Sequence, residues 1–384
     1  MPLLSPDVRI ALVHEWLVVP AGSEQVLREM KVQFPQADVF CLVDKLSQAE
    51  RAMLGVGYPT TSFLQNMPGV TRHYRWMLPM MPAAIELLDL STYDIVISNS
   101  HAVAKGARVR PGALHICHCC SPMRYAWDLR DQYLKEAGLD RGIKGWLAGQ
   151  MLDRLKRWDL SASDRVGEFV AISDFIADRI RRSYGRSSTV IYPPVDTSFY
   201  TPAGARGSSY VAASRFVSYK RIPAIVEAFR ELPDRQLIVI GDGPDREKVA
   251  TLAGTNVTLM GWQPREVLRE TLQQARAFIF AAEEDFGILP VEAQACGAPV
   301  IALGVGGALE TVVSDGPERT GAYFGEATPG GIAAAIRKFE QTEAPSIEAC
   351  RANAERFSSA RFRAELLSYV EGAWSRHQRA MLQK

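Results

Sequence analysis

The sequence predicts an α/β protein made of two Rossmann-like halves. Short apolar segments of strand length alternate with stretches of helix length along most of the chain, which is typical of parallel, doubly wound sheets. The chain has 384 residues, more than one hydrophobic core usually supports, so two domains are expected. Residues 201–209 are rich in Pro, Gly, Ala and Ser and separate the two alternating series, so they predict a linker.

The first half is expected over residues 1–200. It opens with a buried strand within residues 7–17, a turn that contains Gly22 and a helix that ends near Phe34. A helix is also predicted over residues 174–184. Further strands of this half are predicted at residues 38–43, 94–99, 114–119 and 168–173.

The second half is expected over residues 207–350 and repeats the same alternation. Its predicted strands lie at residues 210–214, 236–240, 256–260 and 276–282, and its predicted helices at 222–232 and 265–275. From residue 347 onward the sequence predicts one or two long helices with little strand character.

The stretch from Glu284 to Glu292 follows the strand at 276–282 and leads into a short helix. Loops at the carboxyl ends of parallel strands line the ligand crevice, and a helix N-terminus there offers N–H groups to an anion. Gly287 allows close approach of the backbone, and the two carboxylates can accept hydrogen bonds from hydroxyls. This combination suits a sugar joined to a phosphate. The alternative is that both acids are ordinary charges at a helix start.

The same stretch carries a resemblance to a known family. Glu-x-Phe-Gly-x-x-x-x-Glu, followed by Ala-x-Ala-Cys-Gly-x-Pro-Val, resembles the signature of retaining glycosyltransferase family four. The resemblance spans both halves and is most specific from Arg215 to Val300. It implies the GT-B architecture, two Rossmann-like domains facing a central cleft, with the donor held mainly by the second domain and the acceptor mainly by the first. It also implies that helices over residues 351–384 cross back to the first domain.

The resemblance assigns donor-binding roles to residues of the second half. Arg215 and Lys220 would hold the donor pyrophosphate and stabilise the departing diphosphate, although a solvated loop is the alternative for a single lysine there. Glu284 would reach the sugar and Glu292 the ribose hydroxyls. The remaining implied donor contacts are the backbone of Phe286, Gly287, Ile288 and Leu289, the base site at Gly261 and Trp262, and Gly22 of the first half, for which a tight turn is the alternative.

Residues 114–128 form the most unusual stretch of the first half. Its His and Cys side chains do not predict zinc, because neighbouring cysteines on a strand point to opposite faces and no second C-x-x-C pair exists. The resemblance implies that His118, at the strand end, contacts the sugar and the site of transfer. We therefore predict His118, Glu284, Arg215 and Lys220 as the catalytic residues.

The string Pro-Met-Arg-Tyr-x-Trp-Asp over residues 122–128 resembles a bacterial subgroup that builds surface polysaccharides. On this basis Arg124 and Asp128 are predicted on the acceptor side. His101 follows another strand end and is a further candidate there, with a half-buried capping histidine as the alternative.

Two stretches, residues 61–84 and 142–158, interleave basic side chains with Trp and Met. This composition suits attachment to an anionic membrane face. The alternative is that the apolar residues belong to the core and the cations are solvated. The residues concerned are Arg72, Arg75, Trp76, Met77, Met80, Met81, Lys144, Trp146, Arg154, Lys156, Arg157 and Trp158.

Composition excludes several classes of function. The net charge of +1 gives no attraction to nucleic acid, and no apolar run is long enough to span a membrane. Six scattered cysteines without a signal peptide favour reduced thiols and a cytoplasmic location. If the basic stretches with Trp and Met attach to a membrane, the protein would lie peripherally on the inner face of the cytoplasmic membrane. Because Asp-x-Asp is absent, we expect no metal and no cofactor, only a nucleotide-sugar co-substrate.

These observations lead to a functional hypothesis. The protein would transfer a hexose with retention, mannose from GDP-mannose by preference, to a lipid-linked oligosaccharide in surface polysaccharide biosynthesis. The choice of mannose rests on the subgroup resemblance alone. The alternative is an isomerase of the same architecture, a nucleotide-sugar 2-epimerase, which would need no acceptor.

Overall fold

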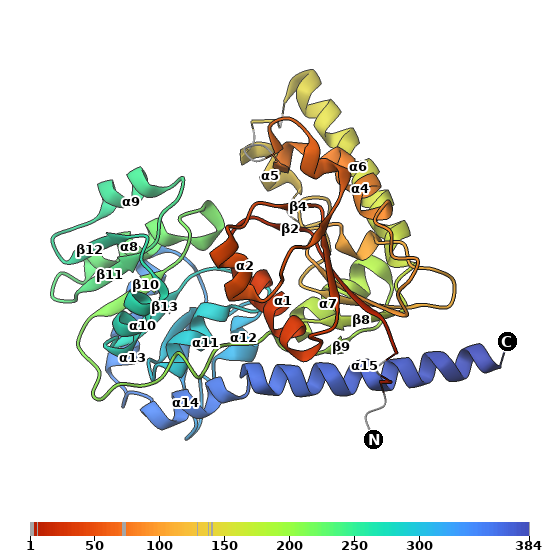
Figure 1. The fold of residues 1–384 in the computed structure, drawn as a ribbon. Helices are drawn as coiled ribbons and strands as arrows, with labels where there is room; N and C mark the ends of the chain where they lie inside the picture. Colours follow the sequence, from red (N-terminus) through yellow and green to blue (C-terminus); the bar gives the residue numbers. More distant parts are fainter. Residues whose placement is uncertain are drawn as a thin grey trace. The chain divides into compact units, whose positions relative to one another are not determined.

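A computed structural model describes residues 4–5, 7–70, 74–128, 130–136, 138–139 and 141–383. The chain divides into two compact units. Unit 1 comprises Met1–Tyr192 and Phe362–Lys384, and unit 2 comprises Pro193–Arg361. Each unit contains a parallel β-sheet with helices packed on it, as predicted (Figure 1).

Unit 1 is organised around a seven-stranded parallel sheet. Its strand order is β5 (Thr60–Thr61), β3 (Asp38–Cys41), β1 (Ile10–His14), β6 (Ile95–Ser100), β7 (Leu114–Cys119), β8 (Glu168–Ala171) and β9 (Thr189–Val190). β2 (Trp16–Leu17) and β4 (Val43–Asp44) form a separate parallel pair. The first three strands of the large sheet lie on one side and the later ones on the other, so the order reverses between β1 and β6.

The helices of unit 1 cover both faces of this sheet. They are α1 (Gly22–Gln33), α2 (Gln48–Leu54), α4 (Met81–Glu86), α5 (Arg130–Glu136), α6 (Gly142–Ser163), α7 (Asp174–Tyr184) and most of α15 (Ser359–Leu382), with 3-10 turns η1 (Phe63–Asn66), η2 (Tyr74–Met80) and η3 (Ala104–Gly106). Alternation along β1 explains the two layers, because successive side chains of a strand point to opposite faces. Ile10 and Leu12 enter one core cluster, whereas Ala11 and Val13 enter the other.

The long helix α15 completes the first of these clusters. Its apolar residues recur every three or four positions, which places them on one face of the helix. This face packs with the side chains of β1 and α1. The helix residues in the cluster are Phe362, Leu366, Val370, Ala373 and Trp374.

A fully buried ion pair joins η3 to α6 in unit 1. Lys105 Nζ lies 2.5 Å from Asp159 Oδ1, and it also donates to the carbonyl of Ala102. The other carboxylate oxygen of Asp159 accepts hydrogen bonds from Trp127 Nε1 at 2.9 Å and from the Tyr184 hydroxyl at 2.6 Å. Burial by itself lowers the pKa of Lys105, but the carboxylate of Asp159 outweighs it and raises that pKa above its usual value.

Unit 2 repeats the plan with a six-stranded parallel sheet. Its strand order is β12 (Val257–Gly261), β11 (Leu237–Ile240), β10 (Tyr210–Ala213), β13 (Ala277–Phe280), β14 (Val300–Leu303) and β15 (Gly321–Phe324), so here the order reverses between β10 and β13. Its helices are α8 (Ile222–Ala228), α9 (Arg246–Leu252), α10 (Arg265–Gln273), α11 (Ile288–Ala295), α12 (Ala308–Thr311), α13 (Pro329–Glu340) and α14 (Ile347–Glu355), with 3-10 turns η4 (Ser218–Lys220) and η5 (Phe229–Glu231).

The unit boundaries differ from those expected at residues 200, 207 and 350. Residues 193–206 and 351–361 belong to unit 2. Val195 pairs with Ser358, and the guanidinium of Arg206 donates to the carbonyl oxygens of Gly297 and Pro345. The predicted linker is therefore attached to unit 2 by side-chain hydrogen bonds that its composition did not reveal.

Candidate functional site

The reversal of strand order in unit 2 marks its candidate site. In open parallel sheets, ligands bind outside the carboxyl ends of the strands at such a point. The loop after β10 carries Arg215 and Lys220, and the loop after β13 carries Glu284. The sheet topology thus brings together two loops that are more than sixty residues apart in the sequence.

Lys220 and Glu284 form an ion pair in this structure. Both side chains are largely buried, whereas Arg215 is exposed on the same loop as Lys220. An ammonium held beside a carboxylate can exchange it for the oxygens of a diphosphate, because both partners are anionic oxygen acceptors. Glu284 would then be released towards the hydroxyls of a sugar.

Glycines hold the neighbouring loops against these residues. Gly241 and Gly243, after β11, have φ values of 136° and 158°. A Cβ on Gly241 would lie 1.8 Å from the carbonyl oxygen of Ser214, and one on Gly243 would lie 2.5 Å from that of Phe216. This loop therefore lies directly on the segment that carries Arg215. In the sequence these two glycines follow the predicted strand at residues 236–240, but they were not among the predicted site residues.

A second glycine loop, after β14, was missed entirely. A Cβ on Gly307 would lie 2.3 Å from Cα of Phe286, and its N–H donates to the Glu284 carbonyl at 2.8 Å. This contact fixes the backbone of the Glu284 loop from the side of β14. The available signal was the adjacent pair Gly306-Gly307, which begins three residues after β14 ends at Leu303.

Helix α11 begins at the predicted place. Gly287 is its N-cap with φ 89°, and Ile288 and Leu289 form its first turn. Phe286 is buried and packs edge-on against Phe357, with the ring centroids 5.3 Å apart. The N-terminus of α11 thus directs its unpaired N–H groups to the carboxyl edge of the sheet, where an anion is stabilised.

Glu292 lies one turn further along α11 in a group of polar side chains. It accepts a hydrogen bond from Tyr200 and faces Arg265, which also bonds Asp196 at 2.8 Å. Burial raises the pKa of Glu292 to about 7, although Arg265 and Tyr200 oppose this shift. The carboxyl therefore changes its charge within the physiological range.

Gly261 is the last residue of β12 at the same edge, and Trp262 follows it. The carbonyl of Gly261 accepts a hydrogen bond from the N–H of Gly241 at 2.8 Å, and Gly261 has φ 68° with open space beside it. Trp262 is largely exposed. Gly261 therefore adjoins the glycine loop after β11, and the base site at Gly261 and Trp262 stays a prediction.

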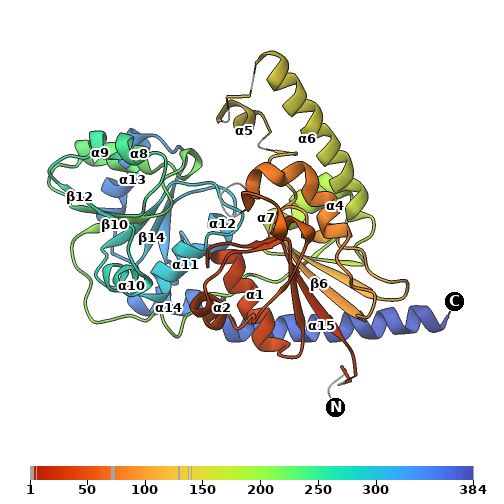
Figure 2. The same cartoon turned by 45° about the horizontal axis from the view of Figure 1, so that its top comes forward.

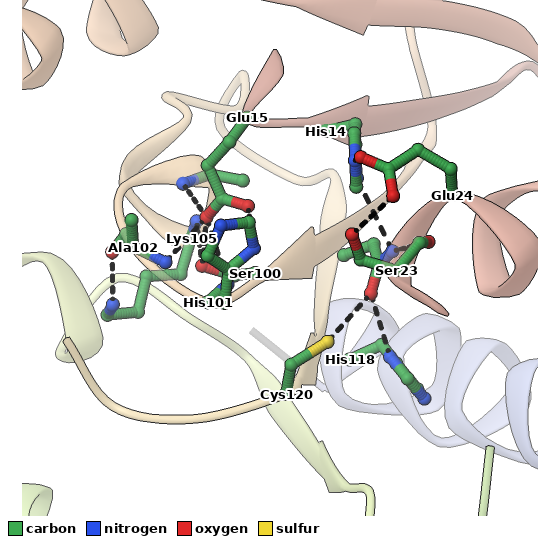
Figure 3. A network of polar contacts seen from close by, with 12 residues as sticks. His14, Glu15, Ser23, Glu24, Ser100, His101, Ala102, Lys105, His118 and Cys120 are labelled. Carbon is green, nitrogen blue, oxygen red and sulfur yellow. Dashed lines mark hydrogen bonds and ion pairs between the residues drawn. The ribbon is translucent and has the colours of Figure 1, made fainter. Parts of the chain in front are cut away.

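His118 occupies a different environment from the one predicted. It lies within β7, has no exposed surface and packs edge-on against Phe362, with the ring centroids 5.8 Å apart. Its Nδ1 is 3.0 Å from Asn99 Oδ1, and burial lowers its pKa to about 4, so the ring is neutral. A side chain without exposed surface does not reach a sugar in this arrangement. The half-buried residue at the strand end is Cys120, whose Sγ lies 3.2 Å from Asn99 Oδ1 (Figure 3).

Of the other residues predicted for the first half, His101 lies in one polar network with His118 and with Ser23, the neighbour of Gly22 (Figure 3). Asp128 forms an ion pair with Arg179 at 2.7 Å, Arg124 is half-buried, and Gly22 is the first residue of α1. His101 pairs with Glu15, which was not among the predicted site residues. The signal available for Glu15 was an acidic residue directly after the first strand.

Among the described residues, no group of three or more His, Cys, Asp or Glu side chains could hold a metal ion. Within the same residues, none of the helices has the length and apolar character needed to cross a bilayer.

Comparison with known proteins identifies both units. Residues 20–199 match the family described as Glycosyltransferase Family 4, and residues 208–357 match the family described as Glycosyl transferases group 1. The structure also resembles that of Anabaena Alr3699/HepE in complex with UDP, with a TM-score of 0.71 at 16% identity over 95% of this chain and 100% of that one. The chain belongs to the GT-B glycosyltransferases.

Two curated relatives of this glycosyltransferase carry specific names. One is a GDP-mannose-dependent monoacylated alpha-(1-6)-phosphatidylinositol monomannoside mannosyltransferase of Corynebacterium glutamicum, 31% identical over 172 residues, which are 37% of this chain and 45% of that protein. The other is a D-inositol 3-phosphate glycosyltransferase of Mycobacteroides abscessus, 28% identical over 201 residues, which are 47% of this chain and 43% of that protein. The chain thus spans less than half the length of each.

The basic, Trp-containing stretches of the glycosyltransferase divide between core and surface. Met81 is buried, and Trp158 donates to Glu86 at 2.8 Å, so these residues are structural. In contrast, the first turns of α6 expose apolar side chains, and Figure 2 shows this end of the helix projecting from unit 1. The exposed fractions are 79% for Ile143, 63% for Trp146 and 55% for Leu147, with Trp76 exposed in η2; Arg72 lies outside the described residues.

The raised pKa of Glu292 gives a testable pH dependence. If its carboxylate accepts hydrogen bonds from the ribose, donor binding requires the ionised form, which increases as the pH rises through about 7. Between pH 6 and pH 8 the KM for the donor should fall by up to about tenfold. Glu292→Gln should have a KM that is higher and nearly constant over this range; a pH profile like that of the unmodified protein would exclude Glu292 as its origin.

Proposed function

We propose that this glycosyltransferase moves a hexose from a nucleotide sugar, with retention of configuration, to a lipid-linked oligosaccharide in surface polysaccharide biosynthesis. The observation that carries the proposal is the Lys220–Glu284 ion pair, which lies where the strand order of unit 2 reverses, beside the N-terminus of α11. Cation, acid and helix N-terminus together suit a sugar joined to a diphosphate.

In this proposal, residues of unit 2 bind the donor and stabilise the departing diphosphate. Lys220, Arg215 and the first N–H groups of α11 bind the diphosphate and stabilise the negative charge that develops as the sugar–phosphate bond breaks. Glu284 binds the sugar and Glu292 the ribose. The departing phosphate oxygen takes the proton of the acceptor hydroxyl on the same face of the sugar, so retention needs no enzymic nucleophile. We infer that protein cations do this without a metal.

GDP-mannose is the donor we favour. This choice is supported by the GDP-mannose dependence named for the corynebacterial relative and by the subgroup resemblance of residues 122–128. HepE, which shares only the fold at this level of identity, was solved with UDP and with UDP-glucose. A panel of donors is therefore the first measurement.

A lipid-linked acceptor also gives a role to the exposed end of α6. Ile143, Trp146 and Leu147 would enter the interfacial region of the bilayer, with Lys144 beside them contacting anionic headgroups. We infer from this surface a peripheral protein at the cytoplasmic face of the membrane.

The test combines donor, acceptor and membrane. GDP-, UDP- and ADP-sugars, each radiolabelled in the sugar, are incubated with the protein and with vesicles that contain a bacterial lipid extract. Label is followed into lipid, and the release of free nucleoside diphosphate is measured in parallel. We expect transfer from one donor, GDP-mannose. If the sugar stays joined to the diphosphate and changes its configuration, the protein is an epimerase and the proposal fails.

A matched pair of variants separates membrane contact from chemistry. Trp146→Ser should lower binding to vesicles that contain phosphatidylglycerol, and transfer to lipid with it. Leu160→Ser, at an exposed position near the other end of α6, should leave both unchanged. Equal vesicle binding by the two variants would exclude this end of α6 as the contact.

A further inference from the structure

Unit 1 has its own pair of opposite charges at the point where its strand order reverses. Glu15 directly follows β1 and His101 directly follows β6, and these strands are neighbours in the sheet. In unit 2 the equivalent point holds Lys220 and Glu284. Sheet topology therefore marks Glu15 and His101 as a ligand position of unit 1.

The carboxylate of Glu15 is fixed by an unusually complete set of donors. It has no exposed surface. Its Oε1 accepts hydrogen bonds from the Ser100 hydroxyl at 3.1 Å and from three backbone N–H groups, those of His101 at 3.0 Å, Ala102 at 2.7 Å and Ala104 at 3.2 Å (Figure 3). Burial raises the pKa of Glu15, but His101, His14 and these donors outweigh it and hold the pKa far below the usual value. These contacts therefore favour the ionised form of Glu15.

This anion orients His101. The Nδ1 atom of His101 lies 2.8 Å from Glu15 Oε2, and the ring meets Trp16 edge-on, with the centroids 4.9 Å apart. The side chain is 31% exposed, in contrast to the fully buried Glu15. With Nδ1 committed to the carboxylate, Nε2 is the atom left to contact a ligand, and among the described residues it has no hydrogen-bond partner.

Four charged or titratable groups surround the imidazole. Glu15 and Glu24 favour its protonated form, Lys105 opposes it, and the ring of His14 lies 6.5 Å away and is itself paired with Glu24 at 3.4 Å. Burial also opposes protonation, but the carboxylates prevail and raise the pKa of His101 above its usual value. Near neutral pH the ring is therefore biased towards imidazolium, a hydrogen-bond donor at both nitrogens.

We propose that His101 binds a phosphoryl oxygen of the acceptor through Nε2–H, with Glu15 as the positioning residue that fixes its orientation. The proposal rests on the proposed function, because an oligosaccharide linked to a lipid through phosphate supplies such an oxygen. A hydrogen bond from imidazolium to phosphate is charge-assisted and so stronger than one between neutral groups. His101 would thus select acceptors by their phosphate.

A general base at this position would behave in the opposite way. A base needs the neutral imidazole, so the rate would increase as the pH rises through the pKa of His101. If His101 instead binds phosphate as an imidazolium, it loses this charge as the pH rises through its pKa. Acceptor binding then weakens as the pH rises. The direction of the pH dependence decides between the two roles.

The direct test observes the histidine itself, without donor or transfer. Histidine labelled with ¹³C at Cε1 gives six signals at most, and the His101 signal is assigned by its loss in His101→Gln. The labelled protein is titrated with pH in the absence and presence of inorganic pyrophosphate, and separately with vesicles of phosphatidylcholine that contain phosphatidylglycerol. The Lys220→Ala background removes the main cation of the donor site.

We expect pyrophosphate to shift the His101 signal and to raise its titration midpoint. A response to the anionic vesicles alone would assign the phosphate to the membrane surface instead of a soluble group. The role of His101 as a hydrogen-bond donor to phosphate would then stand. An unchanged signal with both probes would overturn the proposal. Glu15→Gln should move the titration midpoint of the His101 signal to lower pH. If this variant does not fold, the titrations of the unmodified protein with pyrophosphate and vesicles decide whether His101 binds phosphate.

Kinetics provide the second readout. His101→Gln should raise the KM for the acceptor by about tenfold or more and leave the KM for the donor within about twofold, whereas His101→Arg should restore part of the affinity and remove its pH dependence. His377→Gln, at a half-buried histidine of α15, is the matched control. Equal acceptor KM values in His101→Gln and the control would exclude the role. If no acceptor is glycosylated at all, the proposed function fails, while the pyrophosphate response of His101 is judged independently.

Discussion

Lys220→Ala is expected to lower the rate of sugar transfer by about 10²- to 10³-fold, the loss that follows removal of one charge-stabilising donor from an active site. In the structure Lys220 is paired with Glu284 beside the N-terminus of α11. Without the ammonium, the departing diphosphate loses its most buried counter-charge. The measurement is kcat for transfer under saturating donor, with hydrolysis of the donor followed in parallel.

The control for this variant is Lys248→Ala, which removes an exposed lysine of α9 in the same unit. It should retain full kcat. Glu284→Gln should also transfer slowly, but with a smaller change in affinity for free nucleoside diphosphate, because it leaves the cation in place. Full kcat in Lys220→Ala would refute the assignment of the site to this loop.

Lys105→Met is expected to have the largest effect on stability. The change leaves the carboxylate of Asp159 buried without its counter-ion, which costs about 3–5 kcal/mol of unfolding free energy. Trp262 is the one tryptophan of unit 2 and the other six lie in unit 1, so tryptophan fluorescence during urea unfolding follows mainly the unit that contains the pair.

Two further variants test this explanation. Lys144→Met removes an exposed lysine of α6 and should change the unfolding free energy by less than about 0.5 kcal/mol. The double variant Lys105→Met, Asp159→Leu should regain much of the lost stability, since no unpaired charge remains. If Lys105→Met lowers the unfolding free energy no more than Lys144→Met does, the buried pair contributes little to stability.

The alternation of strands and helices could be predicted from the sequence because parallel strands covered on both faces are continuous apolar runs. The predicted runs at residues 114–119 and 210–214 correspond to β7 and β10. Tertiary contacts were harder to predict. Nothing in the sequence near Arg206 indicates that it bonds the carbonyls of Gly297 and Pro345, so the linker was assigned from composition and its attachment was missed.

In the site, too, local motifs could be predicted from the sequence, whereas tertiary contacts could not. Lys220 and Glu284 were each found from local motifs, but only sheet topology brings them into contact. His118 was predicted from the family resemblance at its strand end, yet its side chain faces the core beside Phe362, a residue more than 240 positions later. Glu15 lacks a local motif, since its role depends on N–H groups of residues 101–104.

The contribution of α15 to unit 1 has a consequence for biosynthesis. Unit 2 is one continuous stretch, residues 193–361, and can fold as soon as it leaves the ribosome. The core of unit 1 still lacks Phe362, Leu366 and Val370 at that moment, although residues 1–192 emerged first. The order of completion is therefore the reverse of the order of translation, and a nascent chain stalled before residue 362 would present the apolar face that α15 covers to chaperones.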